Sequence, residues 1–184
     1  AAIWAAPVLT RDYGQQPGDF AGWMGGVLLL SGLLGTILGG LSVDWGQKTR
    51  LRGGLLIGAV IATLLGIPGA LFPLMPSVAG FAILLGLLLT CGAVTGLVAA
   101  TAIAVQVPNE VRGVCLGAFL VLGAVVGLGL APTLVTLISE LFGGESHIRY
   151  GLTVVTLVTS LIAAAGFLWA MRAVEPSPSS ASEA

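Results

Sequence analysis

Long stretches without a single charged side chain constrain this sequence more than any other feature. Four of them run from Phe20 to Val43, from Gly53 to Asn109, from Gly113 to Ser139 and from Tyr150 to Met171. A membrane-spanning helix needs about 20 consecutive apolar residues and tolerates few ions near its centre. These stretches therefore predict a chain of membrane-spanning helices.

The composition supports this interpretation. Of the 184 residues, 57% are hydrophobic and 8% are charged, whereas about 25% are charged in an ordinary soluble domain. A soluble domain of this size needs a charged surface, because most of its chain touches water. Seven basic and eight acidic side chains do not supply one, and they leave no basic patch for nucleic acid. Membrane lipid is the expected surrounding, and nucleic acid is not an expected partner.

The longest stretch predicts two helices rather than one. It is too long for a single span and contains Pro68, Pro73 and Pro76, which places a tight turn near residues 72–77. The expected fold class is therefore all-α, a polytopic transmembrane helix bundle over residues 1–172. Its spans are expected at about 1–9 (partial), 20–43, 53–73, 77–106, 113–139 and 150–171.

The two ends of the chain differ. Ala1 to Leu9 is too short to cross a membrane and lacks the basic flank and cleavage site of a signal peptide. We therefore expect the end of a truncated first helix, so that the chain is a fragment of a longer protein. Residues 173–184 are rich in Pro and Ser and predict a disordered tail.

The positions of Lys and Arg predict an orientation. Alternate gaps between the spans divide them five to two: Lys48, Arg50, Arg52, Arg112 and Arg172 against Arg11 and Arg149. Because cytoplasmic loops are enriched in Lys and Arg, the side with five is expected to be cytoplasmic, together with the C-terminal tail.

Pairs of glycines four residues apart occur on three predicted spans. They are Gly35 and Gly39, Gly92 and Gly96, and Gly123 and Gly127. Small residues let membrane helices approach closely, so these pairs predict packing seams; the alternative is that they line helices that slide or rock. Pro132 is expected to bend its span and to free a backbone carbonyl.

The interiors of the spans contain no ionisable side chain apart from the two thiols Cys91 and Cys115, for which we expect packing and no disulfide. The candidates for a polar path are neutral: Thr90, Thr95, Thr101, Gln106 and Thr133. Thr90 and Thr101 share one helix face, and Thr95 and Gln106 share another. The alternative is that each threonine bonds the preceding turn of its own helix. No metal site and no cofactor is expected.

The most specific motif lies in the first predicted cytoplasmic gap. Residues 39–52 read GGLSVDWGQKTRLR, in which an acidic residue at a helix end is followed by a glycine and a basic cluster. The segment resembles the signature loop of the major facilitator superfamily, which has Gly, three residues, Asp, a basic residue, Gly and further basic residues. Gly40 and Asp44 match this spacing. Trp45 replaces the usual basic residue and Gly46 comes one position early, as in the degenerate second copy of that loop.

A second stretch is similar to the same superfamily. Glu110 and Arg112 lie in VPNEVRG at residues 107–113, followed by a glycine-rich span that contains Pro132. This pattern resembles the loop between the tenth and eleventh helices of the family and the helix after it. The resemblance implies the C-terminal six-helix half of a carrier, with the first helix truncated and the N-terminal half missing. It also implies a bacterial inner (plasma) membrane, and a subgroup similar to Spinster-like or organic-anion carriers.

The leading functional hypothesis is therefore a secondary active transporter that moves a small organic solute, by symport or antiport, through alternating access. In such a carrier Asp44 would act as a cytoplasmic gate, with Gly40 in the same loop and Lys48, Arg50 and Arg52 as partners or lipid anchors. Glu110 and Arg112 would make a second cytoplasmic contact. For the basic residues the alternative is membrane topology alone.

Two other classes of protein remain as alternatives. One is a non-transporting membrane subunit or receptor that packs against a partner. The other, more remote, is an intramembrane enzyme, which the sequence disfavours because it has no Gly-x-Ser-x-Gly motif, no intramembrane His and no carboxylate pair. We expect that the protein is not an enzyme.

Overall fold

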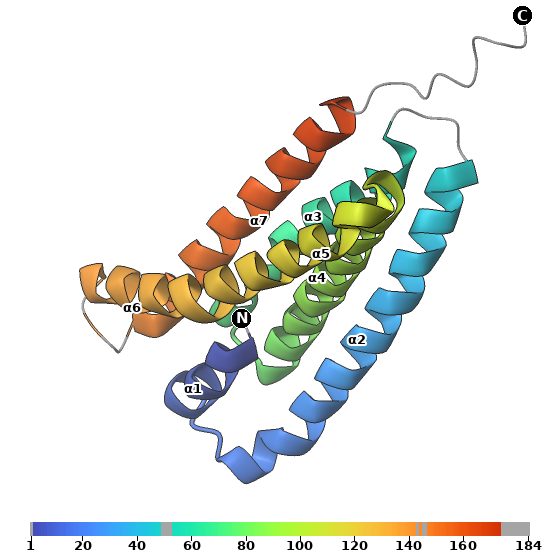
Figure 1. The fold of residues 1–184 in the computed structure, drawn as a ribbon. Helices are drawn as coiled ribbons and strands as arrows, with labels where there is room; N and C mark the ends of the chain where they lie inside the picture. Colours follow the sequence, from blue (N-terminus) through green and yellow to red (C-terminus); the bar gives the residue numbers. More distant parts are fainter. Residues whose placement is uncertain (1, 49–52, 143, 145–146, 174–184) are drawn as a thin grey trace, which may run out of the picture.

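A computed structural model describes residues 2–48, 53–142, 144 and 147–173 of the chain (Figure 1). These residues are helical apart from short turns. In chain order the elements are α1 (Ala2–Asp12), α2 (Pro17–Lys48), the 3₁₀ turn η1 (Gly54–Leu56), α3 (Ile57–Gly69), the 3₁₀ turn η2 (Phe72–Leu74), α4 (Val78–Gln106), α5 (Asn109–Ala124), the π-helical segment η3 (Val125–Leu130), α6 (Ala131–Leu141) and α7 (Ile148–Ala173).

Five segments of this fold are long and apolar enough to cross a membrane. They are Pro17–Lys48, Gly54–Leu74, Val78–Gln106, Asn109–Leu141 and Ile148–Ala173. The all-α class is thus confirmed for the described residues, and these helices have the length and composition of an integral membrane protein. The proline-rich turn near residues 72–77 is present, because α3 ends at Gly69 and the side chain of Ser77 caps the start of α4.

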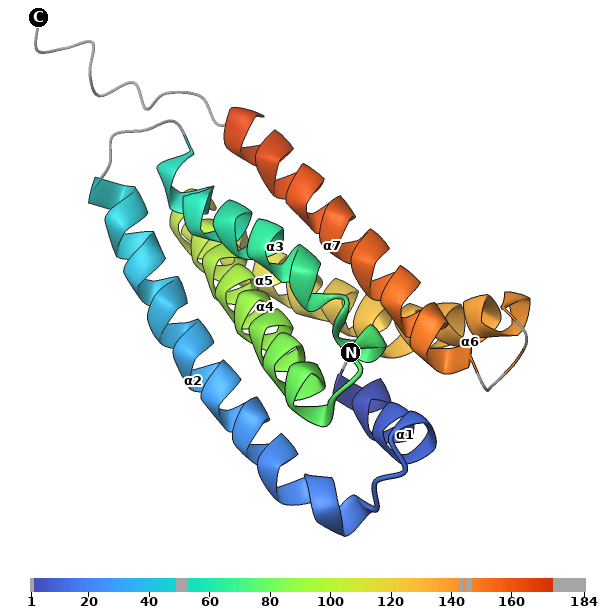
Figure 2. The same ribbon diagram turned by 180° about the vertical axis from the view of Figure 1, so that it is seen from behind.

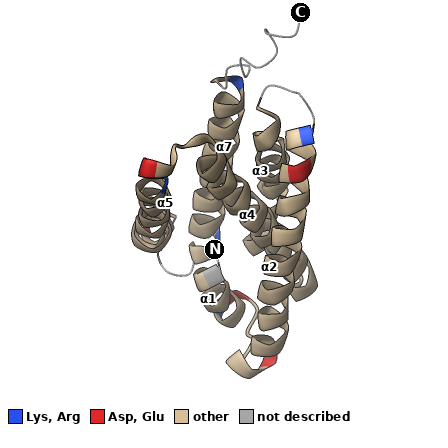
Figure 3. Cartoon of the chain, turned by 45° about the vertical axis from the view of Figure 1, so that its right-hand side comes forward, with Lys and Arg blue, Asp and Glu red and all other residues tan. Residues whose placement is uncertain are grey.

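The bundle has two ends, which Figure 1 separates clearly. At one, which we call the Lys48 end, α2, α4 and α7 finish and α3 and α5 start. At the other, which we call the Asp12 end, α1 finishes and α2 and α4 start. Figure 3 shows that most charged residues lie toward these ends, while the middle of the bundle carries other side chains. This distribution is the one that an apolar membrane interior requires.

Glycines decide how closely α2 approaches α4. A Cβ atom at Gly35 would overlap the Cβ of Ala93 and would lie 2.9 Å from the carbonyl oxygen of Thr90. One turn later, a Cβ at Gly39 would lie 2.8 Å from the side chain of Leu97. The packing seam predicted from this glycine pair is confirmed. In the same interface the hydroxyl of Ser31 donates to the carbonyl of Gly86 across 3.2 Å.

Helix α3 packs against both α4 and α7. Gly66 and Gly69 face Leu88 of α4, with a Cβ at Gly69 only 3.1 Å from the Leu88 side chain. At the Lys48 end, Gly53 adopts a positive φ of 66° directly against Met171 of α7. An L-residue strains this left-handed conformation and would also need the space of Met171, so glycine is required there on both grounds.

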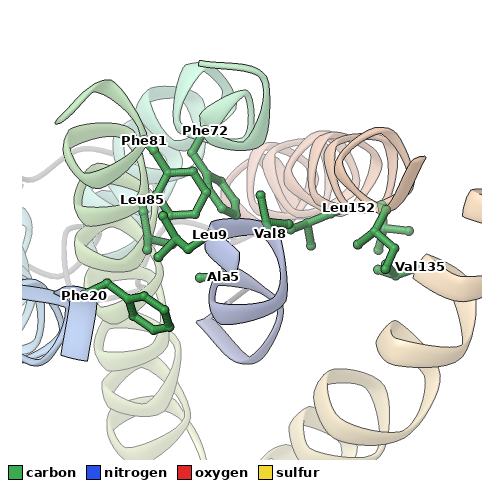
Figure 4. Close-up of a cluster of buried hydrophobic side chains, with 11 residues drawn as sticks. Ala5, Val8, Leu9, Phe20, Phe72, Phe81, Leu85, Val135 and Leu152 are labelled. Atoms are coloured by element: carbon green, nitrogen blue, oxygen red, sulfur yellow. The ribbon is translucent and has the colours of Figure 1, made fainter. Parts of the chain in front are cut away.

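A hydrophobic cluster at the Asp12 end joins five helices (Figure 4). Leu9 of α1 packs there with Phe72 and Phe81, whose rings meet edge to face at 5.0 Å between centroids. Just after α1, the hydroxyl of Tyr13 donates to the carbonyl of Met75. Burial raises the pKa of Tyr13, and the nearby Asp12 carboxylate adds to this, while Arg149 opposes it. The cluster fixes α1 against the rest of the bundle.

The α5–α6 span is different from the others. No residue of α5 or η3 is buried, and burial begins only at Val135 and Ser139 of α6. Figure 1 shows α5 on one face of the bundle, and Figure 2 shows α3 and α7 on the opposite face. A π-helical segment over residues 125–130 precedes Pro132, which lies in the first turn of α6 and is the residue predicted to bend this span.

Candidate functional site

The predicted gating residues lie on helix α2 rather than in a loop. α2 continues to Lys48, past the expected end at Val43, and places Asp44 and Lys48 four residues apart on one exposed face. Asp44 makes no ion pair with any residue that the structure describes. Arg50 and Arg52 lie outside the described residues. The structure therefore places Gly40, Asp44 and Lys48 of the predicted gate, and the pairing of Asp44 with basic residues stays a prediction.

The glycines of this motif have unequal surroundings. Gly40 is half-buried, and no atom lies within 4 Å of the position of its Cβ. Gly46 is buried, and a Cβ there would overlap the backbone carbonyl of Gly54 and lie 3.2 Å from the Cα of Leu55. Because backbone atoms do not move aside as a flexible side chain does, Gly46 is the glycine that lets the end of α2 contact the start of the next span.

The second predicted contact is local in this structure. Glu110 is exposed in the first turn of α5, where a carboxylate favours the helix N-terminus. Arg112 is half-buried, and its Nη2 donates to the carbonyl oxygen of Val107 across 3.2 Å. Its Nε atom has no acceptor among the described residues. Arg112 thus ties α5 to the turn that precedes it.

One hollow of the described chain is a groove between α3, α4, α5 and α7, with a volume of about 660 Å³. We call it the α4–α7 groove. Its α4 wall includes Gly92, Thr95 and Gly96, its α5 wall is Phe119, and its other walls come from α3 and α7. No charged residue lines it. The groove is therefore apolar, with a few hydroxyl groups.

The predicted path residues separate in space. Only Thr95 lines the α4–α7 groove; Thr90, Thr101, Gln106 and Thr133 do not. Each of the four threonines donates its hydroxyl to the carbonyl four residues earlier, at distances of 2.6 to 3.2 Å. This is the local bonding that the sequence left open as the alternative. Gln106 is exposed and ends α4, and Thr133 is exposed on α6.

The polar part of the groove comes mainly from α7, which the sequence analysis did not single out. Thr156, Thr159 and Ser160 all line it, and their hydroxyls donate to carbonyls of their own helix. A signal was present, because these residues recur three and four positions apart and continue as Ala163 and Phe167. A mostly apolar stretch with a small polar face is easily read as lipid-facing.

Two of the three predicted glycine seams have no neighbour in the described part of the chain. Around Gly92 and Gly96, and around Gly123 and Gly127, no atom lies within 4 Å of the Cβ position. Gly92 and Gly96 instead line the α4–α7 groove. Their prediction as packing seams is therefore not met by the helices that the structure describes.

The α5–α6 span contributes a different feature, at the middle of its length. Pro132 has no N–H, so a carbonyl of the preceding π-helical turn loses its usual partner. The hydroxyl of Thr133 donates a hydrogen bond to the carbonyl of Gly129.

Both thiols, of Cys91 and Cys115, are free. Among the described residues no group of three or more His, Cys, Asp or Glu side chains forms a metal site.

No protein-family model, curated protein or solved structure matches this chain.

Proposed function

We propose that the chain is part of a secondary active transporter of the major facilitator type, which moves a small organic solute by alternating access. The observation that carries this proposal is the α5–α6 span. It is apolar and almost unburied, and a π-helical turn and Pro132 interrupt it at mid-length.

Interrupted helices are common where transporters bind their substrates. A regular helix pairs all its backbone groups, so an irregular turn at membrane depth is tolerated only where protein or a water-filled cavity satisfies it. In many carriers such turns lie near the bilayer midplane, where two helical bundles meet. The exposed face of α5 and η3 would meet the second bundle there, and Thr133 would lie beside the path.

The resemblance of the sequence adds independent support. The five observed spans and the motif around Asp44 suit the C-terminal half of a carrier, whose N-terminal half is then the principal partner. On this proposal the Lys48 end is cytoplasmic, because it holds most of the basic residues. Asp44 is exposed at that end and available to pair with the other half when the carrier closes.

The test uses the longest natural reading frame that contains this chain, reconstituted in liposomes with and without an imposed proton gradient. Initial uptake of radiolabelled lactate and of glucose is measured for the parent protein, for Asp44→Asn and for the matched control Asp19→Asn at the opposite end of α2. We expect gradient-dependent uptake that Asp44→Asn slows and Asp19→Asn leaves unchanged.

Two outcomes would count against the proposal. Equal rates for Asp44→Asn and the parent would remove the gating role while leaving transport in place. If neither solute enters faster than in protein-free liposomes, and a broader set of organic acids and sugars gives the same result, a non-transporting subunit becomes the better account. The exposed apolar surface of α5 suits that alternative as well.

A further inference from the structure

One face of α5 turns toward the rest of the bundle. Its half-buried residues are Arg112, Cys115, Leu116 and Phe119, and the other residues of this helix are exposed. Positions three, four and seven residues apart share one helical face. Phe119 of this face lines the α4–α7 groove. Arg112 therefore lies on the groove side of α5, about 10 Å nearer to the Lys48 end.

Arg112 is a half-buried cation whose hydrogen bonds are incomplete. A guanidinium stays protonated and carries five N–H donors. Nη2 donates to the carbonyl of Val107, whereas Nε is buried without an acceptor, and no carboxylate pairs with Arg112 among the residues that the structure describes. Glu110 is exposed two positions earlier and therefore faces another way. An anion beside Arg112 would satisfy both the charge and the free donor.

The groove itself suits a hydrocarbon chain better than a polar solute. No charged residue lines it. Every hydroxyl group in its lining already donates to a carbonyl of its own helix; these belong to Thr63, Thr95, Thr156, Thr159 and Ser160. A site for a polar solute presents convergent polar groups that are free to bind it. The walls of this groove instead offer apolar contact.

The length and direction of the groove match one leaflet of a bilayer. It follows α4 from Leu88 to Ala99 and α7 from Thr156 to Phe167, which is about 16 Å along each helix. Half of a hydrocarbon core of roughly 30 Å is about 15 Å. Ala99 and Phe167 are the ends of the groove nearer to the Lys48 end, where α5 starts with Arg112 on its groove side. An acyl chain in the groove would thus have its headgroup near Arg112.

We infer that Arg112 and the α4–α7 groove together bind an anionic membrane phospholipid. The phosphate accepts hydrogen bonds from the guanidinium of Arg112, and one acyl chain lies in the groove beside Gly92 and Gly96. No atom lies within 4 Å of the Cβ positions of these glycines, so the chain has room there. Basic pockets between membrane helices bind anionic headgroups in this way. The inference goes beyond the proposed function, because a resident lipid needs no transported solute.

The first test concerns the headgroup. The reading frame used for the uptake assay is purified in detergent and titrated with phosphatidylglycerol or phosphatidylcholine of identical chains, and native mass spectrometry measures the bound lipid. We expect phosphatidylglycerol to bind about tenfold more tightly, as one charge-assisted contact allows. Arg112→Gln should abolish this preference. The control Arg172→Gln, which removes an exposed cation in the last turn of α7, should keep it.

Two results of this titration would overturn the inference. One is a preference for phosphatidylglycerol that survives in Arg112→Gln. The other is displacement of the lipid by an equal concentration of glycerol phosphate, which has the anionic group but no acyl chain, because the site would then take a soluble anion. Arg112→Lys keeps the charge and should retain part of the preference; circular dichroism of each variant checks that it is folded.

The second test locates the acyl chain and does not alter Arg112. Phosphatidylglycerol with a nitroxide on one chain should give an immobilised component in its electron paramagnetic resonance spectrum when it binds the parent protein. Gly92→Leu fills the groove with a side chain and should remove this component. The control Gly32→Leu, on an exposed position of α2 where likewise no atom lies within 4 Å of the Cβ, should keep it.

An immobilised component of equal size in Gly92→Leu and Gly32→Leu would place the chain elsewhere and overturn the inference. This measurement also decides the matter if Arg112→Gln does not fold, because position 92 has open space around it. Neither test involves solute movement. Lipid binding can therefore fail while uptake persists, and uptake can fail while lipid binding is found.

Discussion

Replacing Gly35 by alanine tests whether the α2–α4 interface determines the stability of the bundle. The added Cβ would overlap the Cβ of Ala93 and lie 2.9 Å from the Thr90 carbonyl oxygen, where ordinary contacts begin near 3.4 Å. The two helices must therefore separate locally. The hydrogen bond of 3.2 Å from Ser31 to the Gly86 carbonyl lies in the same interface and would lengthen.

The magnitude follows from three contributions. Forced overpacking costs about 1 to 3 kcal/mol, and weakening one hydrogen bond costs about 1 kcal/mol. Alanine is a better helix former than glycine by about 1 kcal/mol, which offsets part of the loss. We expect Gly35→Ala to lower the free energy of unfolding by about 1 to 3 kcal/mol.

Equilibrium unfolding in mixed micelles of SDS and dodecyl maltoside, followed by circular dichroism, measures this change. The control is Gly32→Ala, on the same helix, where no atom lies within 4 Å of the added Cβ; it should be neutral or stabilising. A second replacement, Ala93→Gly, should recover part of the stability lost in Gly35→Ala. If Gly35→Ala unfolds at the same SDS fraction as Gly32→Ala, close packing at this seam does not stabilise the bundle.

Three further outcomes are expected. Gly46→Ala should destabilise the chain in the same assay while Gly40→Ala is tolerated, because only the Cβ at position 46 meets the Gly54 backbone; equal effects would contradict this. Tyr13→Phe should cost about 1 kcal/mol, since it removes the hydrogen bond to the Met75 carbonyl, and an unchanged midpoint would show that the bond contributes nothing. The raised pKa of Tyr13 favours the neutral hydroxyl in the folded state, so the contribution of Tyr13 to stability is complete below pH 10.0 and is lost as pH rises through the raised pKa. A titration of the unfolding midpoint across this pH range checks whether stability falls as expected, and Tyr13→Phe is the control that lacks this contribution.

Much of the fold could be predicted because a membrane-spanning helix needs about 20 apolar residues and few charges near its centre. Five apolar helices of membrane-spanning length and the proline-rich turn before Ser77 follow from where charges and prolines fall. The expected ends of spans differ from the observed ones by a few residues. The largest such difference is at α2, which continues to Lys48, and Gly46 near its end packs against Gly54.

Less of the candidate site could be predicted. The sequence placed Thr95, Thr90 and Thr101 on α4, but it carries no information about which face of α4 meets a neighbour. That depends on how closely α2 and α3 approach, which Gly35 and Gly69 decide. The groove residues of α7 were missed because Thr and Ser are common in apolar spans, where their hydroxyls bond carbonyls of their own helix, as those of Thr159 and Ser160 do. The sequence therefore did not mark them as part of a site.

The sequence by itself determined where the long apolar stretches and the charges lie and how many helices of membrane-spanning length the apolar stretches form, because these depend on composition along one dimension. Only the tertiary structure decided which glycine seams are filled and which are open. Gly35 and Gly39 meet a helix, whereas Gly92 and Gly96 line the α4–α7 groove. The physical reason is that a glycine seam specifies close approach but not a partner, and the partner is set by the packing of all the helices together.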